Sequence, residues 1–321
     1  MLNRTVLSWT VKRNDQSGYL LRWGTSSRDE PSKVGMSGAL WRRSGLAMLL
    51  ATFVSVACAS RAATPPPGSP VTNGLLLRVD TRGGSLAPAA TLSRIPQFSL
   101  YADGLLVMEG AQIEIYPGPA TPPVFSMNVD TEGVRRIAGA ARMAGLDGPN
   151  RSYENPTGGD VGTTTFTFID RGRTHTTSVA GLGIEPSDPS VPQSERKARA
   201  ALQELDGRLG NLRGWLPAGS VSRDQPFEYQ RLAVIVSDQP SGEGPDQPAL
   251  TWPLDRPVAD LAEPVAGAPA ISCLVVSGQD LAKLRPLVAR ANDLTPWKSD
   301  GHTYWLRFRP LLPDESRCPH L

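Results

Sequence analysis

The sequence contains few of the residues that build metal centres and catalytic sites. It has three histidines and three cysteines in 321 residues, and none of them stands at the spacing of a metal-ligand motif. The Gly-rich phosphate loops and the Gly-x-Ser-x-Gly nucleophile motif are also absent. Ser194 and Lys197 match the Ser-x-x-Lys pattern of penicillin-binding enzymes, but the companion motifs of those enzymes are missing. We therefore predict no metal, no cofactor and no catalytic residue that the sequence can identify.

Excess basic charge is lacking over most of the chain. The formal net charge is +2, and residues 1–58 contribute +5, which leaves −3 for residues 59–321. A nucleic-acid-binding domain shows a basic face or a high isoelectric point. The charge balance therefore argues against a nucleic-acid partner.

The apolar run over residues 45–57 is too short to span a membrane. It has 13 residues, whereas a membrane-spanning helix needs about 20. Arg42 and Arg43 precede the run and small residues follow it, which is the layout of a secretory signal peptide over residues 36–58. A buried core helix is the alternative, and the two arginines before the run and the prolines after it disfavour that alternative.

Cys58 is the candidate for a lipid anchor. Together with Val56 and Ala57 it looks like the end of a bacterial lipobox, in which the cysteine is acylated and becomes the first residue of the mature protein. Ser55 departs from that motif, which usually carries leucine there. Cleavage after Ala59 also fits the small-x-small pattern of signal peptidase sites. We expect the membrane to be a partner through this lipid, on the extracytoplasmic face, with free secretion as the alternative.

The composition divides the chain into four parts. Residues 1–35 are polar and without period, and we interpret them as a non-native upstream extension or a disordered segment, with Met36 as the true start; a long cytosolic leader is the alternative. Residues 59–72 are rich in proline and predict an extended tether behind the signal peptide. Residues 73–321 are long enough for one large domain or two lobes, over 73–185 and 192–321.

The folded part is predicted to be α+β, with mostly antiparallel sheets and about three packed helices. Asp-Gly or Arg-Gly turns between alternating runs indicate two hairpins, over 98–108 and 163–180. Apolar residues at helical spacing indicate helices that begin after Asp130, Pro192 and Ser277. A loose strand–helix–strand recurrence suggests two related lobes.

Three details of this prediction can be checked individually. Alternation over residues 112–116 predicts a strand with Ile113 and Ile115 facing inward. The sequence from Ser277 to Asp280 matches a capping box. Pro286 lies inside the third helix, where we expect a kink or a break.

The cysteine count predicts one disulfide. If Cys58 takes the lipid, Cys273 and Cys318 remain, and an even remainder in an oxidising compartment favours a disulfide bond. The alternative is that Cys273 is a buried thiol in an apolar strand.

The strand over residues 302–310 carries the most distinctive candidate surface. Trp305, Arg307 and Arg309 alternate with apolar residues and should share one face. This face could bind an anionic or aromatic partner through cation–π and bidentate contacts. The alternative is an outer sheet face on which long side chains cover apolar surface.

Three segments resemble uncharacterised secreted lipoproteins of actinobacteria. They cover residues 98–104, 294–297 and 309–315, followed by Cys318. The resemblance extends over most of residues 70–321 and implies an envelope location. That group carries no established activity, so the resemblance implies no catalytic role for any residue.

Two functions from different classes follow. The first is a non-enzymatic envelope lipoprotein that binds an envelope protein or a small ligand. The second is an envelope hydrolase with an unrecognised site near His175 or His302. Strand histidines without a motif are more often surface residues than members of a site.

Overall fold

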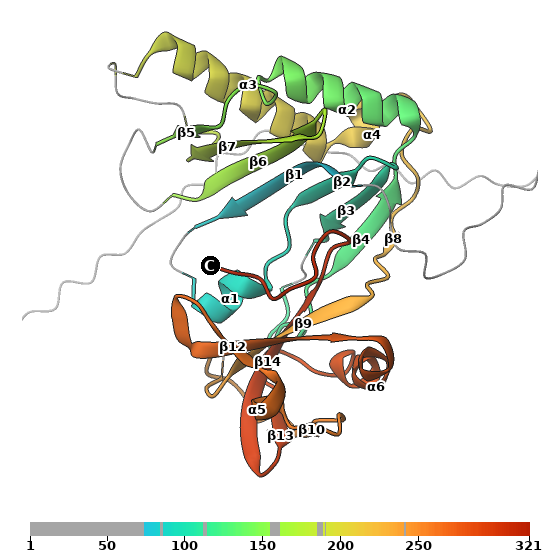
Figure 1. Ribbon diagram of the computed structural model, residues 1–321, viewed down its shortest axis with the longest axis vertical. Coiled ribbons are helices and arrows are strands. Elements are labelled where there is room, and N and C mark those ends of the chain that lie inside the picture. The colour runs from blue at the N-terminus through green and yellow to red at the C-terminus, as the bar shows by residue number, and fades with distance from the viewer. Residues whose placement is uncertain are drawn as a thin grey trace, which may run out of the picture. The chain divides into compact units, whose positions relative to one another are not determined.

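The computed structural model describes residues 74–83, 86–111, 114–154, 161–184, 189, 191–240 and 242–321. All of them belong to one compact unit (Figure 1). The proposed extension, signal peptide, Cys58 and tether lie outside the described residues. The fold is α+β with two mostly antiparallel open sheets and three helices of seven or more residues, as predicted.

The first sheet has eight strands and pairs antiparallel except between its first two members. In sheet order the strands are β5 (Arg151–Tyr153), β7 (Arg173–Ala180), β6 (Thr163–Asp170), β1 (Leu75–Arg82), β2 (Phe98–Tyr101), β3 (Leu105–Glu109), β4 (Val124–Asn128) and β8 (Gln225–Pro226). Both expected hairpins are present, as β2–β3 and β6–β7.

Helices α2 (Thr131–Met143) and α3 (Gln193–Gly210) cover one face of this sheet (Figure 1). Asp130 caps α2 by accepting a hydrogen bond from the Gly133 amide at 2.6 Å, which satisfies one of the amides left free at a helix start. The apolar stripes of both helices meet the inward side chains of β6 in one core. Its members include Ile137, Ala141, Phe166, Phe168, Leu202, Leu205 and Leu209. The short α4 (Leu212–Trp215) follows α3.

The second sheet has six strands. In order they are β10 (Leu250–Thr251), β13 (Pro296–Ser299), β14 (His302–Pro310), β9 (Arg231–Ser237), β12 (Ala268–Ser277) and β11 (Glu263–Val265). The central strand β9 is buried on both faces: Val234 packs in one core and Ile235 in another. Helix α6 (Gly278–Val288) packs in the first of these cores, and the short α5 (Val258–Leu261) adds Val258 to it.

Helix α1 (Pro88–Ser93) joins β1 to β2 of the eight-stranded sheet but packs on β9 and β14 of the six-stranded sheet. Its Leu92 is buried beside Ala233 and Ile235. Helix α1, which connects two strands of the eight-stranded sheet, therefore covers part of one face of the six-stranded sheet.

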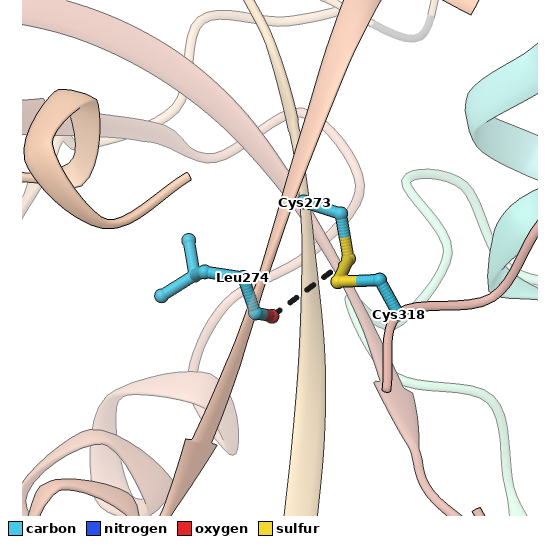
Figure 2. Close-up of a disulfide and its surroundings, with 3 residues drawn as sticks. All are labelled: Cys273, Leu274 and Cys318. Carbon is cyan, nitrogen blue, oxygen red and sulfur yellow. Dashed lines mark hydrogen bonds between the residues drawn. A yellow bond between two sulfur atoms is a disulfide. The ribbon is translucent and has the colours of Figure 1, made fainter. Parts of the chain in front are cut away.

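Residues 311–321, here called the strap, follow the last strand of the six-stranded sheet and contact the eight-stranded sheet. Asp314 accepts hydrogen bonds from Arg78 of β1 at 2.8 Å and from Tyr101 of β2 at 2.6 Å. Cys318 forms the predicted disulfide with Cys273 of β12, with the two Cα atoms 6.1 Å apart (Figure 2). The strap therefore holds the eight-stranded and six-stranded sheets together through polar and covalent contacts.

The carbonyl oxygen of Leu274 lies 3.8 Å from the Cys273 sulfur (Figure 2). Because a disulfide sulfur has no proton to donate, this approach is a van der Waals contact. The bond leaves no free thiol at Cys273 or Cys318, so the alternative of a buried Cys273 thiol does not hold.

The division into lobes at residues 185–192 differs from the structure. Helix α3 and strand β8 lie after that point in the sequence but belong to the core and the sheet of the first half. The leucine stripe of α3 needs an apolar face to cover, and the nearest such face is the sheet that contains β6. The described residues thus form one unit, in which segments from the second half of the chain complete the core and the sheet of the first half.

Two local predictions were wrong. Residues 114–116 lie in no strand, and Ile115 is 53% exposed; the neighbouring strand β3 is already paired with β2 and β4, so it offers no free edge. Ile113 lies outside the described residues. Ser277 is the N-cap of α6 but makes no side-chain capping bond, because it is still paired with Arg231 in the sheet.

Pro286 lies in the last turn of α6, and the helix ends two residues later at Val288. The kink or break expected at Pro286 is therefore the end of helix α6. Ala291 is buried after that end.

Candidate functional site

The predicted alternation along β14 places Trp305, Arg307 and Arg309 on one face. Leu306 and Phe308 pack in the core shared with α6. On the opposite face, the ladder sets Arg307 beside Ile235 and Trp305 beside Ser237 of β9. This is the face on which α1 lies.

Arg309 does not contribute to an exposed surface, which corrects the prediction for that residue. Its side chain is 2% exposed. Its Nε donates to the carbonyl oxygen of Arg94 at 2.8 Å, and its two terminal nitrogens donate to the Glu315 carboxylate. The end of α1 and the strap cover this part of the face, so the predicted surface is reduced to Trp305 and Arg307.

Trp305 and Arg307 line a groove of about 410 Å³, a volume within the range of small-molecule sites. Its walls come from the start of α1, the end of β9 and the start of β12. Most of the other lining residues are alanine, proline or isoleucine: Ala87, Pro88, Ala89, Ala90, Ile235, Pro240, Ala268, Pro269, Ala270 and Ile271. Short side chains on three walls leave the space open, and the lining is mainly apolar.

A second cavity of about 400 Å³ adjoins the groove, because Ala90 and Arg307 line both. This second cavity, here called the polar cavity, is lined by charged side chains from both sheets. Glu109 comes from the end of β3, and Asp293 comes from the turn that follows α6. Arg94 and Ser93 at the end of α1 complete the polar part of its lining.

The polar cavity brings two cations and two carboxylates close together. Arg307 Nη1 lies 3.5 Å from Asp293 Oδ1, longer than a hydrogen-bonded ion pair. Burial raises the pKa of Asp293, and the charge of Arg307 opposes that effect. Burial likewise raises the pKa of Glu109, against the charge of Arg94. Both carboxylates therefore lie where further hydrogen-bond donors would stabilise their charged form.

Backbone hydrogen bonds fix the position of Asp293. Its amide donates to the carbonyl oxygen of Gly118 at 2.9 Å, and the side chain of Asn292 accepts from the Leu294 amide in a tight turn. Ala120 accepts from the Phe308 amide at 3.1 Å. The segment that follows β3 is thus joined to the six-stranded sheet next to the carboxylate.

The predicted histidine site is not assembled among the described residues. Nδ1 of His175, on β7 of the eight-stranded sheet, lies 2.6 Å from the carbonyl oxygen of Gly148. His302 is exposed at the start of β14, with its ring near that of Tyr304. Neither histidine hydrogen-bonds to a carboxylate or a serine in the part of the chain that the structure covers. Ser194 and Lys197 are exposed in the first turn of α3.

The described ranges contain no group of three or more His, Cys, Asp or Glu side chains that could hold a metal ion. Within the same ranges no helix is both long and apolar enough to cross a membrane.

Sequence reasoning missed the polar cavity and most of the walls of the groove. Glu109 and Asp293 are far apart in sequence, and no motif marks either of them. The only local signal was the alternation in β14, which identified Trp305 and Arg307.

Comparison of the chain with protein-family models, with curated proteins and with solved structures found no match in any of the three.

Proposed function

We propose that this protein is exported, anchored to the cell envelope by a lipid on Cys58, and binds a small ligand in the groove at Trp305 and Arg307. The signal-like segment over residues 36–58 and the tether over 59–72 support the location. The binding role is supported by the groove itself, which combines an apolar lining with one aromatic and one cationic side chain.

The observation that carries the binding role is the pair Trp305 and Arg307. Both side chains are partly exposed on the face of the six-stranded sheet on which α1 lies. An indole ring offers a large rigid contact area, and a guanidinium offers five donors for polar groups. Together they suit a ligand with an apolar body and a polar group.

A fluorescent probe of this chemistry tests the groove. The uncharged dye 6-propionyl-2-(dimethylamino)naphthalene has aromatic rings and a carbonyl group that can accept from Arg307, and its emission changes in apolar surroundings. We expect saturable binding that Trp305→Ala and Arg307→Gln each weaken about tenfold, as for the loss of one anchoring contact. Arg135→Gln, an exposed arginine on α2, is the matched control. Equal affinity in all four proteins would contradict a binding site at this groove.

The lipid anchor is tested separately. In cells that process lipoproteins, the native protein should enter the detergent phase and the membrane fraction. Cys58→Ala should leave it in the aqueous phase, because a lipid chain contributes most of the membrane affinity of an anchored protein. Aqueous partitioning of the native protein would favour free secretion after cleavage behind Ala59.

A second candidate function is an envelope hydrolase, and one observation favours it. Glu109 and Asp293 line the same cavity and both have raised pKa values, as expected of carboxyl groups that transfer protons. Release of product from purified cell-wall glycan, lost in Glu109→Gln, would support this function. Absence of turnover at high protein concentration would leave the binding role.

A further inference from the structure

The groove and the polar cavity form one elongated site with two chemically different ends. Ala90 and Arg307 line both spaces, so a ligand in the groove can extend past Arg307 into the polar cavity. We infer that the occupant is an amphiphile whose apolar body fills the groove and whose uncharged, hydroxyl-bearing head, such as a sugar, enters the polar cavity. This inference rests on the proposed binding function and specifies its ligand class.

The balance of charge in the polar cavity favours an uncharged head. Its ionisable lining consists of two cations, Arg94 and Arg307, and two carboxylates, Glu109 and Asp293. A head with a net charge of either sign would add an unbalanced charge to a partly buried space, which is unfavourable. A neutral head leaves the balance unchanged.

Hydroxyl groups match this mixed lining because each one both donates and accepts a hydrogen bond. A hydroxyl can donate to the Glu109 carboxylate, which makes no hydrogen bond to another described residue, and accept from a guanidinium. Hydrogen bonds to charged groups are about twice as strong as those between neutral groups. Several hydroxyls on one ring would use donors and acceptors from both sheets at once.

The groove supplies the complementary apolar half. Its alanine, proline and isoleucine walls and Trp305 contribute mainly apolar surface. Burying an alkyl or aromatic body there is favourable in proportion to the area removed from water. The position of Arg307 at the junction then defines where the apolar part ends and the head begins.

Three probes with the same eight-carbon tail test the choice of head. They are octyl β-D-glucoside, sodium octanoate and octyltrimethylammonium bromide, each titrated below its micelle concentration into the intact protein by calorimetry. We expect the glucoside to bind at least tenfold more tightly than either charged probe. Glu109→Gln should weaken the glucoside about tenfold, because a charge-assisted hydrogen bond becomes a neutral one. It should not weaken octanoate binding, because the substitution removes a negative charge from the cavity.

Glu228→Gln, at a highly exposed carboxylate, is the matched control and should leave all three affinities unchanged. If Glu109→Gln does not fold, as judged by circular dichroism, Asp293→Asn takes its place with the same expectation for the glucoside. Loss of glucoside binding in Glu228→Gln would contradict a specific role for the polar cavity.

The outcomes separate this inference from the function on which it rests. Equal binding of all three probes, lost in Trp305→Ala, would overturn the uncharged head and keep the groove. Preference for the ammonium or the carboxylate probe would also overturn it. Binding that Trp305→Ala leaves unchanged would contradict both the groove and its proposed ligand.

Discussion

Arg309 and Glu315 form a bidentate ion pair in which Nη1 and Nη2 donate to the two carboxylate oxygens at 2.7 and 2.8 Å. The arginine is buried in β14 and the glutamate lies in the strap. A further bond from Arg309 Nε to the Arg94 carbonyl at 2.8 Å links the pair to the end of α1. One guanidinium therefore connects β14 and the strap that follows it to the end of α1, which is 215 residues away in sequence.

Removing the carboxylate should destabilise the protein strongly. Glu315→Ala leaves the Arg309 charge buried without its partner, and we expect the free energy of unfolding to fall by about 3 kcal/mol. Urea denaturation measures this change. Glu204→Ala removes one partner of an exposed ion pair with Arg208 and should cost less than about 1 kcal/mol. Similar losses of unfolding free energy in the two variants would show that the Arg309–Glu315 pair stabilises the fold no more than an exposed ion pair does.

Acid should weaken the contacts of the strap. Burial favours the protonated forms of Asp314 and Glu315, yet hydrogen bonds and the charges of Arg78 and Arg309 outweigh it and hold both pKa values below their ordinary range. A depressed folded-state pKa stabilises the protein above the unfolded value of about 4, and this stabilisation is lost as the pH falls further.

We therefore expect the free energy of unfolding to drop as the pH is lowered from about 5 toward the depressed values. Asp314→Asn should show a shallower drop, since one of the carboxyl groups with a lowered pKa no longer titrates. Urea midpoints measured across this pH range provide the test. An identical pH dependence in the native protein and in Asp314→Asn would contradict the assignment to the strap.

The disulfide should contribute substantially to stability. Cys273 and Cys318 are 45 residues apart in the sequence, and closing a loop of that length stabilises the folded state by about 4 kcal/mol in the chain-entropy model. A double Cys273→Ser, Cys318→Ser variant should unfold at correspondingly lower urea concentration. Alkylation of both residues in the unreduced, denatured native protein would refute the bond itself.

Truncation of Trp297 should reduce mainly the stability of the protein, and truncation of Trp305 should reduce mainly its ligand binding. Trp297 is 0% exposed and packs edge-on against Trp252 and Phe308, so Trp297→Ala should cost about 4 kcal/mol. Trp305 lines the groove and is partly exposed, so Trp305→Ala should cost less than about 1 kcal/mol while it weakens ligand binding. Thermal melts of both variants compare the two, and equal losses would mean that Trp305 serves the core.

The parts of the fold that the sequence predicted are those that local chemistry decides. The Asp-Gly turn after Tyr101 and the Asp130 cap act within a few residues, and the leucine stripe of α3 shows its buried face by spacing alone. The alternation in β14 likewise placed Trp305 and Arg307 on one face.

The parts that the sequence did not predict depend on distant contacts. Arg309 is buried because it meets the carbonyl of Arg94, 215 residues away in sequence, and no local pattern reports such a meeting. The predicted strand failed at residues 114–116 for a related reason, since pairing depends on strands that are distant in sequence. The polar cavity combines Glu109 at the end of β3 with Asp293 in the turn after α6, and only the three-dimensional arrangement brings them together.

The strap also determines the order in which this fold can be completed during synthesis. Arg78 and Tyr101 leave the ribosome 236 and 213 residues before Asp314, the carboxylate that both of them contact. A nascent chain can pair β1 with β2 early. The Arg78 guanidinium has no access to the Asp314 carboxylate until that residue has been synthesised. Final closure around these side chains is therefore a late step, and a product that stops before Asp314 would present an incompletely covered surface to chaperones and proteases.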